Sequence, residues 1–305
     1  MWTPLDGVPK SDGVVWQAIA WALDASGDVV TAFTEAPKSS MLSGCPCGYY
    51  RLPKGSTKFV AAGGMHPNGV VGYIVPDGKG RLYSETGFGF SIQRTSDGGR
   101  TWSAPSGAFA NNPYLRLTGQ YGGLYGLTIV NNELYTGGEG GIIKCDLEMK
   151  SCTEVAAGKT AGYRRNVVSF ASNGGPQTPA TEIFELARSA PATGPNAGAS
   201  LLKWDSESKA WNVVPSTPIL GAWYDAYINA ICKLSGPHEY LMTHYSAIDS
   251  QLLYTDDAVH WTKYDTMGLP AFDRRLKSLF LAVNPLSGAK YMITFGATLD
   301  LYVHK

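Results

Sequence analysis

The sequence predicts an all-β chain, a six-bladed β-propeller of four-stranded antiparallel blades, over residues 1–305 as a single domain. Its N-terminal strand is expected to close the ring by pairing into the last blade. Composition supports this class, because 36 glycines, 18 prolines and 17 tyrosines favour turns and strands over helices. A recurring turn sets the number of blades, and the two chain ends complete one repeating unit.

The recurring turn is clearest in "QRTSDGGRTWSAP", residues 93–105. A polar stretch with Asp, left through Trp or Cys, returns in "KCDLEMKSCTEV", "KWDSESKAWNVV" and "YTDDAVHWTKY". The positions Trp102, Cys152, Trp211 and Trp261 are 50, 59 and 50 residues apart. This spacing is about the length of one four-stranded blade.

Within each turn the residue types indicate a local hydrogen-bonded structure. Asp97 is expected to accept backbone N–H groups, and Gly98 and Gly99 permit positive φ. We expect Asp146, Asp205 and Asp256 to take the part of Asp97 in the other copies, and each Trp ring to lie beneath its own hairpin.

The chain ends supply the remaining strands. "MWTPLDG" begins like "TWSAP", and "KYMITFGATLDLYVHK" offers two strands of a blade that needs one more partner. The 100 residues from Trp2 to Trp102 leave space for two units, with "CGYYRLPKG" as an outer strand. Pairing the first strand with the last removes the open edges of the ring.

"TSDGGRTW", residues 95–102, resembles the Asp-box (BNR repeat), S/T-x-D-x-G-x-T-W, of the sialidase-like β-propellers. The resemblance implies the fold but no particular reaction, because Asp-boxes also occur in lyases, lectin-like propellers, sorting receptors and assembly factors. "YRLP" at residues 50–53 looks like the Arg-Ile-Pro motif of sialidases, but the blade count puts Arg51 on an outer strand. A complete sialidase site is therefore not predicted.

A functional site is expected at the propeller face opposite the Asp-boxes, around one central funnel. The segments that precede the innermost strands, and those that join the second and third strands, converge there. They supply four candidate catalytic residues, eight candidate substrate-binding residues and three surrounding glutamates: His244, Tyr245, Tyr224 and Asp225; His66, Tyr121, Tyr125, Arg164, Arg165, Tyr227, Arg274 and Arg275; and Glu35, Glu85 and Glu139.

Two arginine pairs, "YRRN" and "DRRL", occupy equivalent positions before inner strands. Guanidinium groups bind carboxylates bidentately, which suits a uronate, sialic acid or another acidic ligand. The alternative is that these arginines bond loop carbonyls or pair with Asp225 and Asp273. In "THYS", His244 and Tyr245 offer an acid and a base, but adjacent strand residues point to opposite faces, so only one is expected in the funnel.

Three functions fit these observations. The first is an enzyme with one site in the funnel that acts on an acidic or polyhydroxylated carbohydrate, as a glycoside hydrolase or a polysaccharide lyase. The second is a cyclase or pericyclase of natural-product metabolism, with an aromatic funnel built from "QYGGLYG", "AWYDAY" and "HYS". The third is a carbohydrate-binding propeller without chemistry. Strongly different loops favour one central site over repeated lectin pockets.

Charge and cysteine content limit the partners. Lys plus Arg equals Asp plus Glu at 25 each, so no net charge draws the chain to nucleic acid or to an acidic membrane, and neither partner is expected. The protein is expected to be a monomer. No metal or other cofactor is predicted, because the five histidines lack ligand spacing. Cys145 and Cys152 flank a turn where facing residues are close enough for a disulfide, which would indicate secretion. No signal-peptide pattern begins the given chain.

Overall fold

A computed structural model gives the fold. It describes residues 2–5, 15–36, 48–56, 58–65, 71–86, 91–103, 126–138, 141–157, 163–172, 182–189, 199–205, 207–214, 227–233, 238–245, 250–264, 278–283, 290–295 and 301–304. Within these ranges the regular elements are strands, and none is a helix. No described helix is therefore long and apolar enough to span a membrane. The all-β prediction is confirmed.

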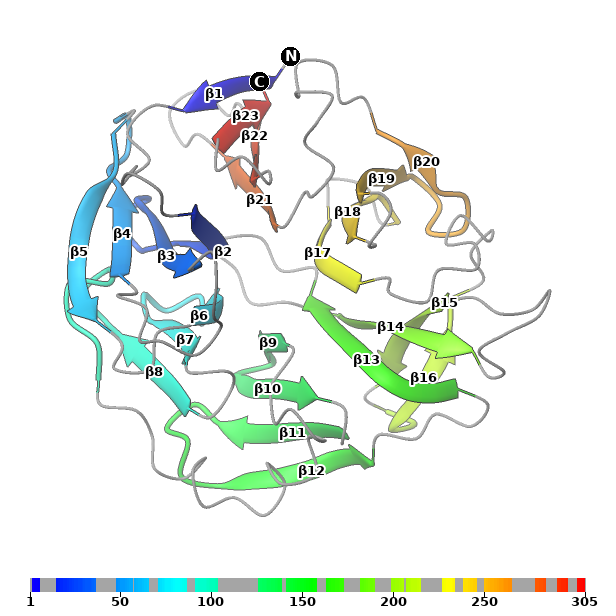
Figure 1. Ribbon diagram of the computed structural model, residues 1–305. Coiled ribbons are helices and arrows are strands. Elements are labelled where there is room, and N and C mark those ends of the chain that lie inside the picture. The colour runs from blue at the N-terminus through cyan, green and yellow to red at the C-terminus, as the bar shows by residue number, and fades with distance from the viewer. Residues whose placement is uncertain are drawn as a thin grey trace.

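The described strands form antiparallel sheets that follow one another around a ring (Figure 1). The first two sheets, in hydrogen-bonded order, are β2 (Val15–Leu23), β3 (Val29–Ala36), β4 (Gly48–Leu52) and β5 (Val60–Met65), then β6 (Val71–Pro76), β7 (Leu82–Thr86) and β8 (Ser91–Thr95). The third is β9 (Gly126–Val130), β10 (Glu133–Gly138), β11 (Gly141–Asp146) and β12 (Cys152–Ala157).

The second half of the chain repeats this arrangement. The fourth sheet is β13 (Tyr163–Ser172), β14 (Ile183–Ser189), β15 (Ala199–Asp205) and β16 (Ala210–Val213). The fifth is β17 (Tyr227–Lys233), β18 (Tyr240–Tyr245), β19 (Ser250–Thr255) and β20 (Thr262–Lys263). The last is β21 (Ser278–Val283), β22 (Lys290–Phe295), β23 (Leu301–His304) and β1 (Trp2–Leu5).

The two ends of the chain meet in one sheet. β1 runs antiparallel to β23, with Trp2 opposite His304 and Leu5 opposite Leu301. Figure 1 shows both termini together beside this sheet. The first strand of the chain therefore pairs with the last, which satisfies backbone groups that an edge strand leaves open.

The core lies between neighbouring sheets. Val30 and Tyr49 of the first sheet, for example, share a buried cluster with Ile74 and Leu82 of the second. Similar clusters join the second sheet to the third, the third to the fourth, and the fourth to the fifth. A sheet with such neighbours on both sides buries both of its faces, so successive residues along its strands are buried.

The Asp turn forms as the sequence predicts. The Asp97 carboxylate accepts the Thr101 N–H at 2.9 Å and the hydroxyls of Thr95 and Thr101 at 2.8 and 2.6 Å. Gly98 and Gly99 have φ values of 70° and 82°, the left-handed region that glycine adopts without strain. Asp146 and Asp205 also accept backbone N–H groups of their turns.

One turn residue differs from the prediction. In the turn that leads to Trp261, the accepting carboxylate belongs to Asp257 and not to Asp256. Asp257 accepts the N–H groups of Val259 and His260 at 2.8 and 2.7 Å, and the Thr255 hydroxyl at 3.0 Å. This turn is one residue shorter between Asp and Trp, and Ala258 takes the left-handed conformation with φ 64°. Counting back from Trp therefore identifies the wrong Asp.

The tryptophans that leave the turns differ in what they contact, whereas the sequence analysis placed each Trp beneath its own hairpin. Trp211 meets Trp204, directly opposite it in its own sheet, edge-on with ring centroids 5.3 Å apart. The other two contact the preceding sheet. Trp102 stacks on Tyr49 of the first sheet, with ring centroids 4.0 Å apart. Trp261 is 7% exposed and packs in a cluster with Phe184 and Leu201 of the fourth sheet. In the third sheet the predicted disulfide between Cys145 and Cys152 occupies the equivalent position and is confirmed. Trp102 and Trp261 thus fasten their sheets to the preceding one, and the disulfide joins β11 to β12 within its own sheet.

Candidate functional site

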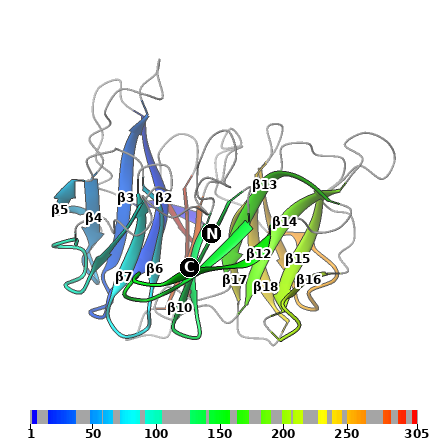
Figure 2. The same cartoon turned by 90° about the horizontal axis from the view of Figure 1, so that it is seen from below.

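The sheets have two different ends. The turns between the first and second strands, such as residues 24–28 and 77–81, lie at the same end as the Asp turns, and we call this the turn end. The opposite end, here called the mouth end, is where β6, β9, β13, β17 and β21 begin and where β3, β7, β10, β14, β18 and β22 finish. Figure 2 shows the sheets in profile between these ends.

The predicted site residues divide into two groups. Arg164, Arg165, Tyr227, His244 and Tyr245 lie in described strands, all within three residues of the mouth end. Glu35 and Glu85 also lie near that end, in β3 and β7. The other predicted residues fall outside the described residues: His66, Tyr121, Tyr125, Glu139, Tyr224, Asp225, Arg274 and Arg275.

Strand register brings some of these positions together. Tyr227 of β17 is directly opposite Tyr245 of β18, and His244 is opposite Ile228. Arg164 of β13 is directly opposite Arg188 of β14. Arg188 was missed by the sequence analysis, which identified its segment only as a connection. Two arginines 24 positions apart give no local signal, so their pairing becomes visible only from the register.

The register is irregular in β2, β6, β13 and β17, whereas the inner strands β9 and β21 pair without a shift. The register shifts between Ala18 and Ala20 in β2 and between Ile228 and Ala230 in β17, and also within β6. The largest shift is in β13, where residues 165–168 all fall opposite Ala187 alone. Bulges of this kind are common beside active sites, because they interrupt the ladder and redirect side chains. Arg165 lies inside the largest of them.

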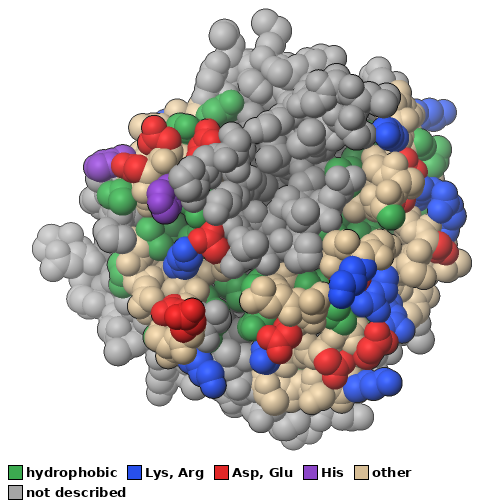
Figure 3. Space-filling view, turned by 180° about the vertical axis from the view of Figure 1, so that it is seen from behind, with side chains coloured by type: hydrophobic (Ala, Val, Ile, Leu, Met, Phe, Trp, Pro, Cys, Tyr) green, Lys and Arg blue, Asp and Glu red, His purple; other side chains and the backbone are tan. Residues whose placement is uncertain are grey.

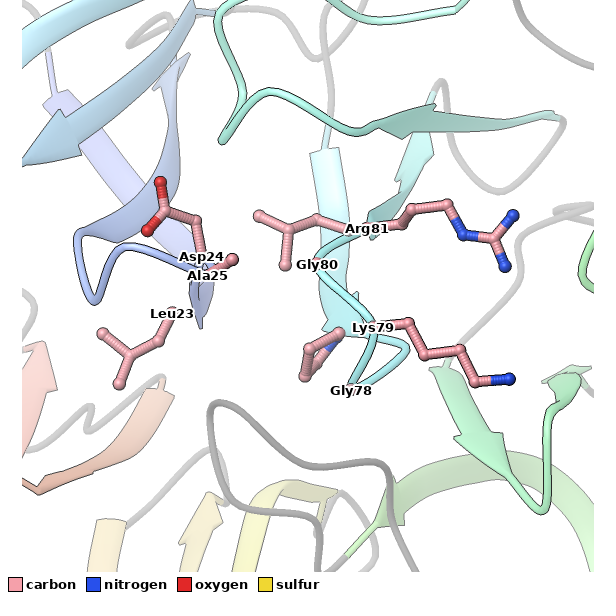
Figure 4. A pocket seen from close by; sticks show the side chains of 9 residues that line it. Leu23, Asp24, Ala25, Gly78, Lys79, Gly80 and Arg81 are labelled. Atoms are coloured by element: carbon pink, nitrogen blue, oxygen red, sulfur yellow. The ribbon is translucent and has the colours of Figure 1, made fainter.

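The turn end contains a cavity of about 330 Å³ between the β2–β3 and β6–β7 turns. Leu23, Asp24 and Ala25 line one side, and Figure 4 shows the side chains of Lys79 and Arg81 extending away from Asp24. The Asp24 carboxylate already accepts the N–H groups of Ser26 and Asp28 and an Arg51 donor. None of the predicted site residues lines this cavity.

Arg51 has a structural role at the turn end. It is 7% exposed and forms ion pairs with Asp24, at 3.2 Å, and with Asp28. Its place on β4, the third strand of its sheet, agrees with the expectation that it is not a sialidase-type ligand. The resemblance of "YRLP" to the sialidase motif is therefore only one of sequence.

Other charges at the turn end also pair between sheets. Glu148, in the hairpin closed by the disulfide, accepts Arg81 at 2.9 Å and also pairs with Arg94 of the second sheet. These two hydrogen bonds lower the pKa of the Glu148 carboxyl. Figure 3 shows acidic and basic side chains intermixed on the face seen from behind. No large field of one sign is expected where they alternate.

The fourth and fifth sheets are aligned by a buried tyrosine. Tyr240 of β18 donates to the Glu182 carboxylate at 2.8 Å, and its ring meets Phe184 of β14 edge-on, with centroids 5.6 Å apart. Burial and the bond to Glu182 together raise the pKa of the Tyr240 hydroxyl. The contact fixes β14 and β18 at one height relative to each other.

The described residues contain no group of three or more His, Cys, Asp or Glu side chains able to hold a metal ion.

Comparison with known proteins gives the fold. No family model and no curated protein matches the sequence. Among solved structures, an α-L-arabinanase of Penicillium chrysogenum complexed with arabinobiose is 12% identical, over 99% of this chain and 97% of that chain, with a TM-score of 0.61. A streptogramin B lyase is 12% identical, over 100% and 97% of the two chains, with a TM-score of 0.56.

A GH74 xyloglucanase from Xanthomonas campestris is 14% identical, with a TM-score of 0.56. The match covers 99% of this chain and 53% of the xyloglucanase, so this chain spans about half of that enzyme's length. At these identities the likenesses support the β-propeller fold and nothing finer.

Proposed function

We propose that the chain is a closed six-bladed β-propeller, in which β1 completes the last blade. The pairing of β1 with β23 supports the closure, and the second sheet has the strands β6, β7 and β8 among the described residues. The Ser103 N–H already donates to the Arg94 carbonyl at 2.8 Å, as the start of a strand beside β8 does. Closure gives one central funnel with one mouth.

We further propose that the protein is an enzyme that acts on an acidic or polyhydroxylated carbohydrate at that mouth. The observation that carries the proposal is the pairing of Arg164 with Arg188 beside the bulge at residues 165–168, on an inner strand. Guanidinium pairs bind carboxylates, and hydroxyl-rich sugars need several polar groups around one funnel. The arabinanase and the xyloglucanase show that this fold accommodates carbohydrate chemistry.

Within this proposal the catalytic residues are His244 or Tyr245, as acid or base, together with Tyr224 and Asp225. The substrate is bound by His66, Tyr121, Tyr125, Arg164, Arg165, Tyr227, Arg274 and Arg275. In a hydrolase the catalytic residues protonate the departing oxygen and activate water. In a lyase one of them removes the proton from the carbon beside a carboxylate.

A second candidate is an enzyme of small-molecule natural products. The streptogramin B lyase shares the fold at full length, and Tyr227 directly opposite Tyr245 places two aromatic residues on adjacent strands at the mouth end. An aromatic funnel binds less polar substrates by stacking and apolar burial. We regard extracellular folding as part of both candidates, since the Cys145–Cys152 disulfide is typical of oxidising compartments.

The experiment gives the purified chain three sets of compounds: polyuronates, neutral arabinan and xyloglucan, and streptogramin B. New reducing ends report hydrolysis, and the ultraviolet absorbance of an unsaturated uronate reports elimination. We expect activity on a carbohydrate that Arg165→Ala lowers and Arg100→Ala, at an exposed Asp-turn residue, does not. Activity on streptogramin B alone would support the second candidate function. Activity on none of the three sets would contradict both candidate functions.

A further inference from the structure

Arg164 and Arg188 are directly opposite each other in the short stretch of ladder between the bulge at residues 165–168 and the mouth end. Directly opposed residues of an antiparallel pair share one face of the sheet, with Cβ atoms about 4.5–5.5 Å apart. Two positive charges at that separation destabilise the sheet unless an anion lies between or beside them. Such a position is a candidate for binding a carboxylate, because each guanidinium offers a planar pair of donors.

The face that carries this pair follows from the buried residues of the same strands. Phe184 of β14 packs in the cluster shared with Met242 and Leu253 of the fifth sheet. β14 pairs with β15 without a register shift from Phe184 to Arg188, so the alternation of faces is unbroken along this stretch. Arg188 therefore holds a register position on the face of the fourth sheet that is turned toward the fifth.

His244 belongs to the facing surface of the fifth sheet. Tyr240 and Met242 of β18 pack in the same cluster with Phe184. The pairing of β18 with β19 is also continuous from Tyr240 to Tyr245, so His244 has the same face as Tyr240 and Met242. Tyr245, one residue further, lies on the other face.

Arg188 and His244 are also at one height between the two sheets. Phe184 and Tyr240 touch edge-on, and each of the two residues lies four positions beyond that contact on its own strand. β14 and β18 are equivalent second strands of successive sheets and run toward the mouth end together. Packed sheets are separated by about 10 Å, enough for a small anionic group between an arginine and a histidine.

We propose that Arg164, Arg188 and His244 form a carboxylate-binding site at the mouth end, where the fourth and fifth sheets face each other. Arg188 is the new specificity residue, and the ligand is the carboxylate of an acidic sugar such as a uronate. This inference rests on the proposed carbohydrate function and narrows its substrate class. Of the two adjacent candidates, His244 and not Tyr245 has its register position on this face.

The binding experiment uses trimers of galacturonate, glucuronate and mannuronate, each beside its methyl ester, with calorimetry as the readout. The ester has nearly the same shape without the charge. We expect at least one acid to bind and its ester to bind far more weakly. Arg188→Gln and Arg164→Gln should each weaken the acid by about tenfold to hundredfold, the usual value of a charged hydrogen bond.

The matched control is Arg100→Gln, which removes an exposed arginine at the turn end and should leave binding unchanged. Thermal unfolding verifies that each variant is folded. If Arg188→Gln is unstable, Arg188→Lys replaces it, because lysine keeps the charge and loses the bidentate geometry. Equal binding of acid and ester, or undiminished binding by the folded Arg188 variant, would overturn the carboxylate site.

A second measurement tests the geometry without a sugar. The ring signals of His244 in the NMR spectrum, assigned by their loss in His244→Gln, should shift in Arg188→Gln and stay in place in Arg100→Gln. Unmoved signals would overturn the placement. If only neutral arabinan or xyloglucan oligosaccharides bind, the carboxylate site is wrong and the carbohydrate function stands; if no saccharide binds, both are wrong.

Discussion

Charged residues have different partners at the turn end and at the mouth end of the strands. At the turn end, carboxylates such as Asp97, Asp24 and Glu148 have partners within their turn or on the neighbouring sheet. At the mouth end, Arg164 is placed opposite Arg188, a second positive charge. Charges that satisfy each other stabilise the fold, and charges of one sign held together are suited to a ligand. We therefore expect substitutions at the turn end to change stability and substitutions at the proposed site to change binding.

The largest expected effect on stability comes from the closing strand. Deleting residues 1–6 removes β1 and leaves β23 as an open edge, which we expect to cost about 3 to 5 kcal/mol of unfolding free energy, the range of a large core truncation. Denaturant unfolding measures the loss. A chain that lacks only Met1 is the control, and an unchanged unfolding midpoint in the longer deletion would show that β1 does not close the ring.

The next largest effect is expected at Gly98. A Cβ atom there would be 2.2 Å from Oδ2 of Asp24, and φ is +70°, so alanine meets both a clash and backbone strain. Moving Asp24 also disturbs its buried pair with Arg51. We expect Gly98→Ala to cost about 3 kcal/mol or more, from left-handed strain of about 1 to 2 kcal/mol and the weakened pair.

Gly55 provides the matched control for this turn. Its φ is +79° but no atom lies within 4 Å of a Cβ built there, so Gly55→Ala should cost only the strain, about 1 to 2 kcal/mol. Folded Gly98→Ala protein should keep the ligand affinity of the mouth end. Equal losses of unfolding free energy in the two alanine variants would mean that the close approach of Gly98 to Asp24 does not matter. A loss of ligand affinity in Gly98→Ala would show that the turn end and the mouth end are not independent.

The sequence predicts the turn end well because its contacts are local. Asp97 and its donors lie within five residues, and the half-cystines are seven residues apart. Longer contacts were predicted less well. The place of Trp102 against Tyr49 depends on which sheet is its neighbour, and Asp257 takes the part expected of Asp256 in a turn that is one residue shorter between Asp and Trp.

The mouth end needs information that the sequence does not hold in any one segment. The sequence identified Arg164 and His244 from residue type and blade position. It did not identify Arg188, because the bulge at residues 165–168 shifts the register of β13 against β14. Counting from the strand ends therefore gives the wrong partner. Which face His244 holds likewise depends on the contact of Phe184 with Tyr240 across two sheets.

The smallest expected effect is the acid sensitivity of the Asp97 turn. Partial burial raises the pKa of Asp97, but the hydrogen bonds from Thr101, Thr95 and Arg100 outweigh it and lower the pKa to about 2. A carboxyl with a depressed folded pKa stabilises the protein above its unfolded pKa, near 3.8, and this stability is lost as the pH falls toward 2. Because Asp97 is partly exposed, solvent screening limits the contribution to about 1 kcal/mol.

Asp97→Asn should therefore lower stability at neutral pH and lose less of it than the wild type between about pH 5 and about pH 2.5, since the variant has no proton to gain at this position. Unfolding free energies at the two pH values measure the difference.

Asp256→Asn is the control: it alters an exposed aspartate beside Asp257, the residue that accepts the turn's N–H bonds, and should leave the pH dependence near that of the wild type. If Asp97→Asn kept the full acid sensitivity of the wild type while Asp256→Asn reduced it, the carboxylates that hold the turn end would have been assigned to the wrong residues. Affinity at the mouth end should be the same in both variants, because neither turn contributes a residue to it.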